Sequence, residues 1–298
     1  MRKSVLIGIV SAFFFTATFI LNRSMNLTGG SFLWASSLRF IFMFLILLLF
    51  MKKDSRKNVK EVISINPKYW LLYSTIGFGL FYFFLSAASD YGESWFIASL
   101  WQLTTVCGIL LTPIFGHKIP LKPLFISIFI LIGVFLLQYE NILVSNMGNK
   151  AFIALIFVLI AGTAYPLGNR KMMAIVGDSL TAMERLYGMT LMSLPFWLII
   201  AAIATYKVGL PSISQLFQSF LVALYSGVIA MYLYFKATNM EKDNPHYLAL
   251  VESTVSAEVI FALLGGIFIL GDRVPSVIGI IGIGFIFTGI ILSAIIKE

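Results

Sequence analysis

Long apolar runs alternate with short polar connections along almost the whole of this chain. The runs fall at residues 4–21, 32–51, 69–88, 94–115, 121–139, 151–168, 181–205, 214–235, 246–270 and 276–296. Each is close to the roughly 20 residues that an α-helix needs to cross the hydrocarbon core of a bilayer. The pattern therefore predicts an all-α membrane protein with ten transmembrane helices.

The connections between the runs leave no room for a separate soluble domain. They are short, except for the charged stretch 52–68. The first run follows Met1-Arg2-Lys3, and no small-residue cleavage site interrupts it before Leu21. We therefore interpret this run as a first spanning helix and not as a signal peptide.

Composition supports the membrane assignment. Apolar residues make up 59% of the 298 positions, charged residues 11%, and the mean hydropathy is +0.96. A soluble protein carries about 25% charged residues. The net charge of +8 does not indicate a nucleic-acid partner, because the basic residues lie between apolar runs. The single cysteine, Cys107, lies inside a run and has no second cysteine with which to form an intrachain disulfide.

The distribution of Lys and Arg predicts the orientation, because cytoplasmic connections are enriched in these residues. With the N-terminus inside, fifteen fall in cytoplasmic segments: Arg2, Lys3, Lys52, Lys53, Arg56, Lys57, Lys60, Lys68, Lys118, Lys122, Arg170, Lys171, Lys236, Lys242 and Lys297. Four fall in outer segments: Arg23, Lys150, Lys207 and Arg273. Both termini are therefore expected in the cytoplasm.

The chain contains an internal repeat. The segment Thr16–Met25 recurs 147 positions later as Thr163–Met172, and a second arginine follows each copy, Arg39 and Arg185. Further matches occur in the same order: Gly77, Tyr82 and Ala87 with Gly227, Tyr232 and Ala237; 114–120 with 269–275; Gly133 with Gly289. Because five helices per half is an odd number, the second half is expected to insert upside down. The predicted units are residues 1–146 and 147–298.

Two glutamates on the ninth run are candidates for binding a proton or a cationic substrate group. An ionisable side chain within hydrocarbon is costly and is by default a functional candidate. On the helical rise, Glu258 lies about 18 Å and Glu252 about 9 Å from the inner end. The alternative for Glu258 is a structural glutamate paired with an arginine or a hydroxyl.

The repeat matches Glu258 with the neutral Leu103 on the fourth run, next to Trp101 and Gln102. These side chains would form an aromatic and amide wall opposite the acidic one, which suits a cationic or amphipathic molecule. We add the matched pair Tyr82 and Tyr232 to the predicted substrate-binding residues. Trp34, Trp70 and Trp95 lie at helix ends and are expected in the interfacial belt.

The repeated Asn-Arg sets suggest gates at the two mouths of a pathway. Arg39, with Asn22, lies toward the outer ends of its helices, whereas Arg185, with Asn169, lies toward the inner ends. We expect Arg39 or Arg185 to contact backbone carbonyls or acids on the closed side. Candidate acids are Asp90 and Glu93 outside and Glu184 inside.

Small residues form a stripe on the tenth run: Gly279, Gly282, Gly289 and Ser293. Such stripes permit close helix approach. We expect the approach to occur within the fold, and a contact in a homodimer is the alternative.

Other chemistries find no support in the sequence. The histidines, His117 and His246, lie at helix ends in different halves, so no metal site is expected. No phosphate-cradling glycine loop is present, and no serine or cysteine has a basic partner deep in a helix. We expect neither a cofactor nor an enzymatic activity.

Several motifs resemble the drug/metabolite transporter superfamily, in particular its larger EmrE-like multidrug-efflux members. The similarity runs nearly end to end and is most specific at 18–25, 29–34, 37–40, 101–103, 165–170, 194–197 and 251–254. The resemblance implies ten helices in two inverted five-helix repeats (an EamA-like fold), alternating access, export and proton coupling. Small members of the superfamily bind the proton on a glutamate of helix 1, whereas run 4–21 contains no acid. Either Glu252 or Glu258 replaces that residue, or proton coupling is absent.

Together with the resemblance, these observations predict a secondary transporter of the bacterial plasma (inner) membrane that exports small amphipathic or cationic compounds by proton antiport. An exporter of amino acids or other metabolites is the alternative within the same class. A membrane scaffold or membrane enzyme is the alternative from another class, although a scaffold does not require Arg39, Arg185 and Glu258 inside hydrocarbon.

Overall fold

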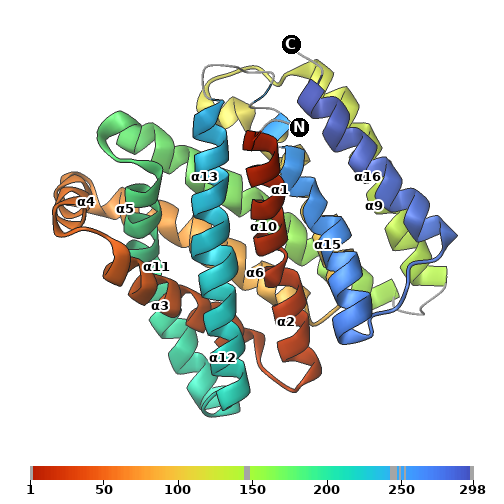
Figure 1. The fold of residues 1–298 in the computed structure, drawn as a ribbon, viewed down its shortest axis with the longest axis horizontal. Helices are drawn as coiled ribbons and strands as arrows, with labels where there is room; N and C mark the ends of the chain where they lie inside the picture. Colours follow the sequence, from red (N-terminus) through yellow and green to blue (C-terminus); the bar gives the residue numbers. More distant parts are fainter. Residues whose placement is uncertain (1–2, 144–147, 242–246, 248–249, 252, 296–298) are drawn as a thin grey trace.

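The structure is a computed structural model that describes residues 3–143, 148–241, 247, 250–251 and 253–295 (Figure 1). These residues form helices and no strand. Seven helices are long and apolar enough to cross a membrane: Lys3–Leu27, Phe32–Phe50, Pro67–Ala88, Leu121–Glu140, Gly148–Ser179, Ala182–Val208 and Ile213–Met240. Three shorter apolar helices, Ser94–Leu110, Thr254–Leu270 and Val277–Leu292, coincide with the remaining predicted runs. The chain is an all-helical, multi-pass membrane protein.

Several of these helices are built from consecutive pieces. The elements up to residue 143 are α1 (Lys3–Phe15), α2 (Ala17–Leu27), α3 (Phe32–Phe50), α4 (Lys53–Ile65), α5 (Pro67–Ser74), π-helical η1 (Thr75–Leu80), α6 (Phe81–Ala88), α7 (Ser94–Trp101), α8 (Leu103–Leu110), η2 (Thr112–Phe115) and α9 (Leu121–Leu143). The later elements are α10 (Gly148–Val176), η3 (Gly177–Ser179), α11 (Ala182–Val208), α12 (Ile213–Val222), π-helical η4 (Ala223–Ala230), α13 (Met231–Met240), η5 (Thr254–Ser256), α15 (Ala257–Gly265), π-helical η6 (Gly266–Leu270) and α16 (Val277–Ile295).

Local sequence signals set several helix ends. The Ser31 and Ser212 hydroxyls accept the free backbone N–H groups of Leu33 and Gln215 at the starts of α3 and α12. Thr181 and Glu184 form a capping box at the start of α11, which satisfies donors that the helix itself cannot. The inner acid predicted as a gate partner, Glu184, is therefore occupied by this cap.

Matched positions in the two halves adopt the same local structure. The repeated glycines Gly77 and Gly227 lie within the π-helical segments η1 and η4. Gly116 and Gly271 end η2 and η6 in the left-handed conformation, with φ of 81° and 68°, which glycine adopts without a Cβ penalty. These two pairs of matched glycines thus share their local backbone conformation, although η2 is a 3₁₀ helix and η6 is π-helical.

Helices pack across the two halves in reciprocal pairs. The first-half helix α1 packs on α13, and its counterpart α10 packs on α6. Likewise α1 contacts α15, while α10 contacts α8; α3 packs on α11 and α7 on α15. At one edge of the molecule α9 and α16 lie side by side (Figure 1).

The small-residue stripe of α16 works within this fold. A Cβ at Gly282 would meet the Gly133 carbonyl, and one at Gly289 would meet Ile130, so both glycines face α9. Gly279 leaves the space that the Glu140 carboxylate occupies. The prediction of an approach inside the fold is confirmed for these three glycines, whereas the homodimer stays a prediction.

A glycine pair brings α10 against η1. A Cβ at Gly168 would fall on the backbone of Gly77. We expect Gly168→Ala to cost about 1–3 kcal/mol of stability, the usual range for overpacking, and so to lower the melting temperature in detergent by several degrees. Gly284→Ala is the matched control, because no atom lies within 4 Å of that Cβ. Equal melting temperatures for the two variants would contradict this account of the crossing.

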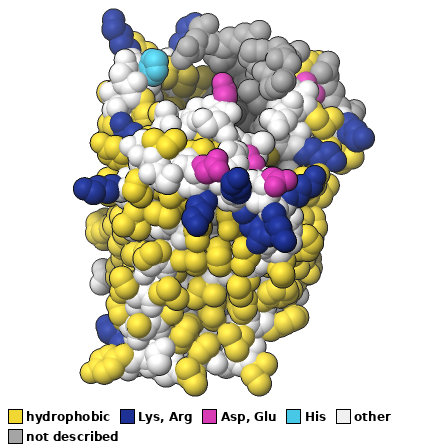
Figure 2. Space-filling model, turned by 90° about the vertical axis from the view of Figure 1, so that its left-hand side faces the viewer, with side chains coloured by type: hydrophobic (Ala, Val, Ile, Leu, Met, Phe, Trp, Pro, Cys, Tyr) yellow, Lys and Arg dark blue, Asp and Glu magenta, His cyan; other side chains and the backbone are white. Residues whose placement is uncertain are grey.

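The surface separates into apolar and charged zones. On the side that carries α4, charged side chains gather in a band, and hydrophobic side chains cover the surface below it (Figure 2). Leu49, Phe50 and Phe217 are among the large exposed hydrophobics. Lys53, Arg56, Lys57 and Lys60 lie on α4. An apolar surface of this size with a charged border fits a bilayer.

The prediction that three tryptophans form an interfacial belt is wrong. Trp70 and Trp95 are 0% exposed and Trp34 is 7% exposed. The indole N–H of Trp34 donates to the Gly209 carbonyl, and that of Trp95 donates to the Arg273 carbonyl, both at 2.9 Å. These two side chains therefore tie helix starts in the first half to connections in the second.

Candidate functional site

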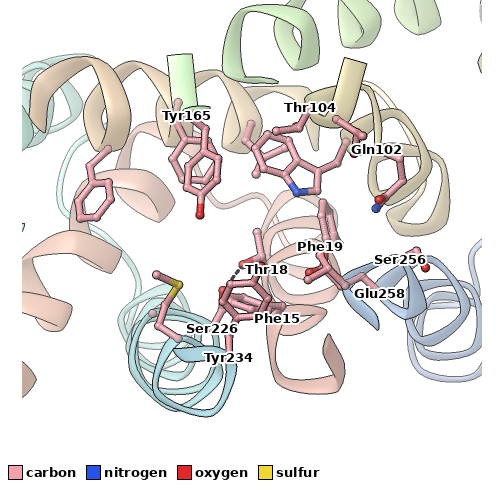
Figure 3. A pocket seen from close by; sticks show the side chains of 18 of the residues that line it. Phe15, Thr18, Phe19, Gln102, Thr104, Tyr165, Ser226, Tyr234, Ser256 and Glu258 are labelled. Atoms are coloured by element: carbon pink, nitrogen blue, oxygen red, sulfur yellow. Dashed lines mark hydrogen bonds between the residues drawn. The ribbon is translucent and has the colours of Figure 1, made fainter. Parts of the chain in front are cut away.

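A cavity of about 480 Å³ lies between the two halves of the bundle. Thr104, Gln102 and Tyr165 line one side, and Thr18, Phe15, Ser226 and Tyr234 face them from the other (Figure 3). Glu258 and Ser256 of the ninth helix lie beside them. The lining of the cavity combines aromatic rings with a few hydroxyl, amide and charged groups, as binding sites for small molecules do.

Aromatic rings form a continuous wall of the cavity. The ring centroids of Phe81 and Tyr165 are 4.8 Å apart, those of Phe81 and Trp101 5.2 Å, and those of Trp101 and Tyr165 5.8 Å. The predicted substrate-binding residue Trp101 thus lies at the cavity. Gln102 also lines it, and the Gln102 amide donates to the Ala98 carbonyl at 3.2 Å. These rings offer faces on which an apolar or cationic body can stack.

Arg39 is buried within the bilayer-spanning part of α3 and faces the cavity. Its side chain is 6% exposed. The guanidinium donates to Thr18 Oγ1 at 3.3 Å and to Ser226 Oγ at 3.0 Å, and its carbon lies 3.9 Å from the centroid of the Tyr82 ring. The two hydroxyls are themselves hydrogen-bonded at 2.6 Å. Arg39 therefore links α3 to α2 and η4 through hydroxyls and to α6 through a ring, and not through the carbonyls or acids that we expected.

Glu258 lies in the first turn of α15, directly after the tight turns of η5. Its side chain is 3% exposed and lines the cavity. Among the described residues no hydrogen bond or ion pair to its carboxylate is found, so the structural alternative of a glutamate paired with an arginine or a hydroxyl gains no support there. Glu252 lies outside the described residues.

Tyr165 lines the cavity together with Glu258 and Arg39, whereas Arg185 is not among the residues that line it. Arg185 is half-buried. Sequence reasoning did not select Tyr165, Thr18 or Ser226, because their roles depend on which helices are neighbours.

The matched pairs of the repeat differ in their surroundings. Asn22 is 3% exposed and bonds the hydroxyl of Tyr82, which is 0% exposed, with Nδ2 3.1 Å from that oxygen. In the second half, the Asn169 amide donates to the Tyr165 carbonyl of its own helix, and Tyr232 is 51% exposed. The Tyr82 ring contacts the Arg39 guanidinium, and neither Tyr82 nor Tyr232 is among the residues that line the cavity.

Charged and polar groups of both halves bond one another at the predicted outer end. Arg23 lies 3.5 Å from Asp272 and donates to Asn26, whose amide donates to Asp90 at 2.9 Å. Asp272 also accepts from the Ser94 backbone N–H at 2.9 Å and from the Ser94 hydroxyl. Together with Glu93, Glu140 and Arg273, these residues form what we call the outer cluster: Arg23, Asn26, Asp90, Glu93, Ser94, Glu140, Asp272 and Arg273.

Within the outer cluster Arg273 links two acids of the first half. It lies 3.7 Å from Glu93 and 3.4 Å from Glu140, which also accepts from the Ser276 backbone N–H at 2.8 Å. The acids predicted as partners for Arg39 thus bind other groups. Sequence reasoning did not single out Glu140, which directly follows run 121–139; its position at the end of an apolar run was the available signal.

The cavity extends away from the outer cluster. Its lining includes Pro123 near the start of α9, Tyr234 of α13 and Ser253, all in the parts of their helices predicted to lie toward the cytoplasm. At the predicted outer end, side chains of the two halves are therefore bonded to each other. The cavity between the halves extends toward the predicted inner end.

Asp90, outside the spanning helices, gives a pH-dependent prediction. Burial raises the pKa of its carboxyl from 3.8 to about 6, against smaller opposing effects of Asn26 and Arg23. Because the folded protein then binds more protons than the unfolded chain between these values, this group's contribution to stability falls as pH rises through that window. We expect Asp90→Asn to flatten the corresponding decline in melting temperature. Asp54→Asn, on exposed α4, is the control, and an unchanged pH profile for Asp90→Asn would contradict the assignment.

The sequence is similar to one protein family and to two bacterial proteins. The family described as EmrE, "Putative multidrug resistance efflux transporter", matches residues 2–298. The chain is 46% identical to "Uncharacterized protein YjlA" of Bacillus subtilis (strain 168) over 311 residues, covering 99% of this chain and 95% of that protein. It is 40% identical to "Uncharacterized 42.1 kDa protein in intracellular alkaline protease 3'region" of Shouchella clausii over 268 residues, 86% of this chain and 70% of that protein. The residues matched by the family include those of the cavity and of the outer cluster.

Proposed function

The chain belongs to the EmrE-like family of multidrug resistance efflux transporters, and from this premise we propose that it exports small molecules by alternating access. The moving parts are two inverted five-helix halves, residues 1–146 and 147–298. The protein lies in the plasma membrane of a bacterium with both termini in the cytoplasm. The basic residues of the cytoplasmic connections support this orientation, and both curated relatives are bacterial.

The reciprocal packing of the halves supports the inverted repeat. A twofold axis in the membrane plane exchanges α1 with α10 and α6 with α13, so a contact between α1 and α13 requires one between α10 and α6. Both contacts are present, as are those of α1 with α15 and α10 with α8. Equivalent π-helical segments at Gly77 and Gly227 support the same relation.

The observation that carries the transport proposal is the combination of one closed end and one central cavity. The outer cluster connects the halves on one side, and the cavity extends to the other. The corresponding closed gate consists of Arg39, Asn22 and Tyr82. No hydrogen bond between the matched residues Asn169 and Tyr232 is found among the described residues. We therefore assign the conformation as inward-facing. Exchange of these contacts between the two ends would expose the cavity to the outside.

Glu258 is the proposed site of proton coupling. An ionised carboxylate inside the membrane is costly without a positive partner, so either a proton or a cationic substrate group neutralises it. Binding of one therefore displaces the other, which is the condition for antiport. The aromatic wall of Phe81, Trp101 and Tyr165 supplies the apolar contact for an amphipathic substrate.

A liposome experiment tests the proposal. The purified full chain is reconstituted with pyranine in an acidic lumen, and amphipathic amines and cationic dyes are added outside one at a time. We expect at least one compound to raise the lumenal pH in protein-containing vesicles and to have no such effect in empty vesicles. A scaffold or an enzyme would give identical traces with and without protein for every compound.

A further inference from the structure

Two opposite charges line the same cavity without neutralising each other. Arg39 projects from α3 and Glu258 from α15, and both side chains are buried. Among the described residues no ion pair within 4 Å joins them, and Tyr165 lines the cavity with them. The site therefore presents separate positive and negative positions around one space.

The positive position is fixed by contacts on both sides. The Arg39 guanidinium carries a positive charge and five N–H donors. Its recorded hydrogen bonds use one donor on each terminal nitrogen, to Thr18 and Ser226. Each terminal nitrogen therefore retains a second N–H, and the residue faces the cavity. A carboxylate is the group that such a planar pair of donors binds best.

The negative position lacks a partner within the described structure. Glu258 accepts no described hydrogen bond and pairs with no described cation, yet it is only 3% exposed. An ammonium group in the cavity would supply both the charge and the hydrogen-bond donors that this carboxylate needs.

We infer that the substrate is an amphipathic zwitterion, with an anionic group that binds Arg39, an ammonium that binds Glu258 and an apolar body against the aromatic wall. This inference rests on the proposed transport function and narrows its substrate class. A purely cationic compound would leave the Arg39 charge without compensation, and a purely anionic one would be repelled by ionised Glu258. A molecule that carries both charges satisfies both positions.

Three compounds with the same ring test this charge requirement: phenylalanine, phenylalanine methyl ester and 3-phenylpropionate. The first carries both charges, the second only the ammonium and the third only the carboxylate. Binding to the purified full chain is measured by isothermal titration calorimetry, which avoids leakage of the ester through vesicles. We expect phenylalanine to bind at least about tenfold more tightly than either analogue, since a site built for a polar group rejects ligands that lack it.

Two variants assign the charges to their residues. Glu258→Gln should reduce the preference for phenylalanine over 3-phenylpropionate to about twofold or less, and Arg39→Gln should do the same for the preference over the methyl ester, because each removes one complementary charge. Wild-type affinities alone test the inference if Arg39→Gln fails to fold.

The inference is overturned if the methyl ester binds as tightly as phenylalanine, or if none of the three compounds binds. Proton-driven flux of cationic dyes in the liposome experiment would then leave the proposed function standing with a different substrate class. Absence of any gradient-driven flux would instead remove the proposed function itself.

Discussion

Replacing Glu258 with glutamine is expected to abolish proton-driven transport while the helical bundle remains folded. The amide has nearly the same shape as the carboxylate but cannot hold a proton or an ammonium by charge. A hydrogen bond to a charged group contributes about 1.5–3 kcal/mol, so the affinity for an ammonium-bearing substrate should fall about 10- to 100-fold. Because the side chain lines the cavity and has no described protein partner, the substitution breaks no described contact.

The measurement is pH-dependent flux in proteoliposomes, with the melting temperature as the test of folding. Glu61→Gln is the matched control, because it removes a carboxylate from the exposed surface of α4. Transport by Glu258→Gln at the wild-type rate, with the wild-type dependence on pH, would remove Glu258 from the coupling site.

Replacing Arg39 with glutamine is expected to stop transport and to lower stability. The guanidinium holds Thr18, Ser226 and the Tyr82 ring around one buried charge. Loss of its hydrogen bonds should cost about 1.5–3 kcal/mol, and flux should fall at least about tenfold because the gate no longer joins α2, α3 and η4.

Arg39→Lys separates charge from shape in this gate. Lysine keeps the positive charge but lacks the planar fork that reaches two hydroxyls, so we expect intermediate stability and flux. Lys207→Gln is the control for loss of a positive charge at an exposed position. Wild-type flux in Arg39→Gln would contradict the gate assignment.

Much of the fold was predictable because the length of each apolar run indicates a membrane-spanning helix. Every predicted run corresponds to an apolar helix, and the repeat located the equivalent glycines of η1 and η4. The helix that contains Asn22 and Arg23 continues to Leu27, six residues beyond the predicted end. Polar residues at the end of an apolar run gave no sign of this extension.

Lateral packing was not predictable in the same way. In lipid both the core and the membrane-facing surface are apolar, so hydropathy does not identify the buried face. Phe40 is 2% exposed and Phe50 is 79% exposed on the same helix. For the same reason Tyr82 and Tyr232 match in sequence but differ in burial, and the tryptophans expected at the interface are in the core.

The charged residues of the site were predictable from the sequence, but the residues that contact them were not. Glu258 and Arg39 stand out because charge is rare in hydrocarbon. Thr18 and Ser226 are ordinary residues in apolar runs, and their importance follows only from the contact between α2 and η4. The outer cluster likewise depends on which connections meet.

A reversible crosslink across the outer cluster tests alternating access most directly. Ser94 and Asp272, which bond each other from different halves, are replaced by cysteine in a background in which Cys107 is replaced by alanine. The account predicts that oxidation locks the outer end closed and stops flux in proteoliposomes, and that reduction restores it. Undiminished flux through fully crosslinked protein would contradict alternating access between the two halves.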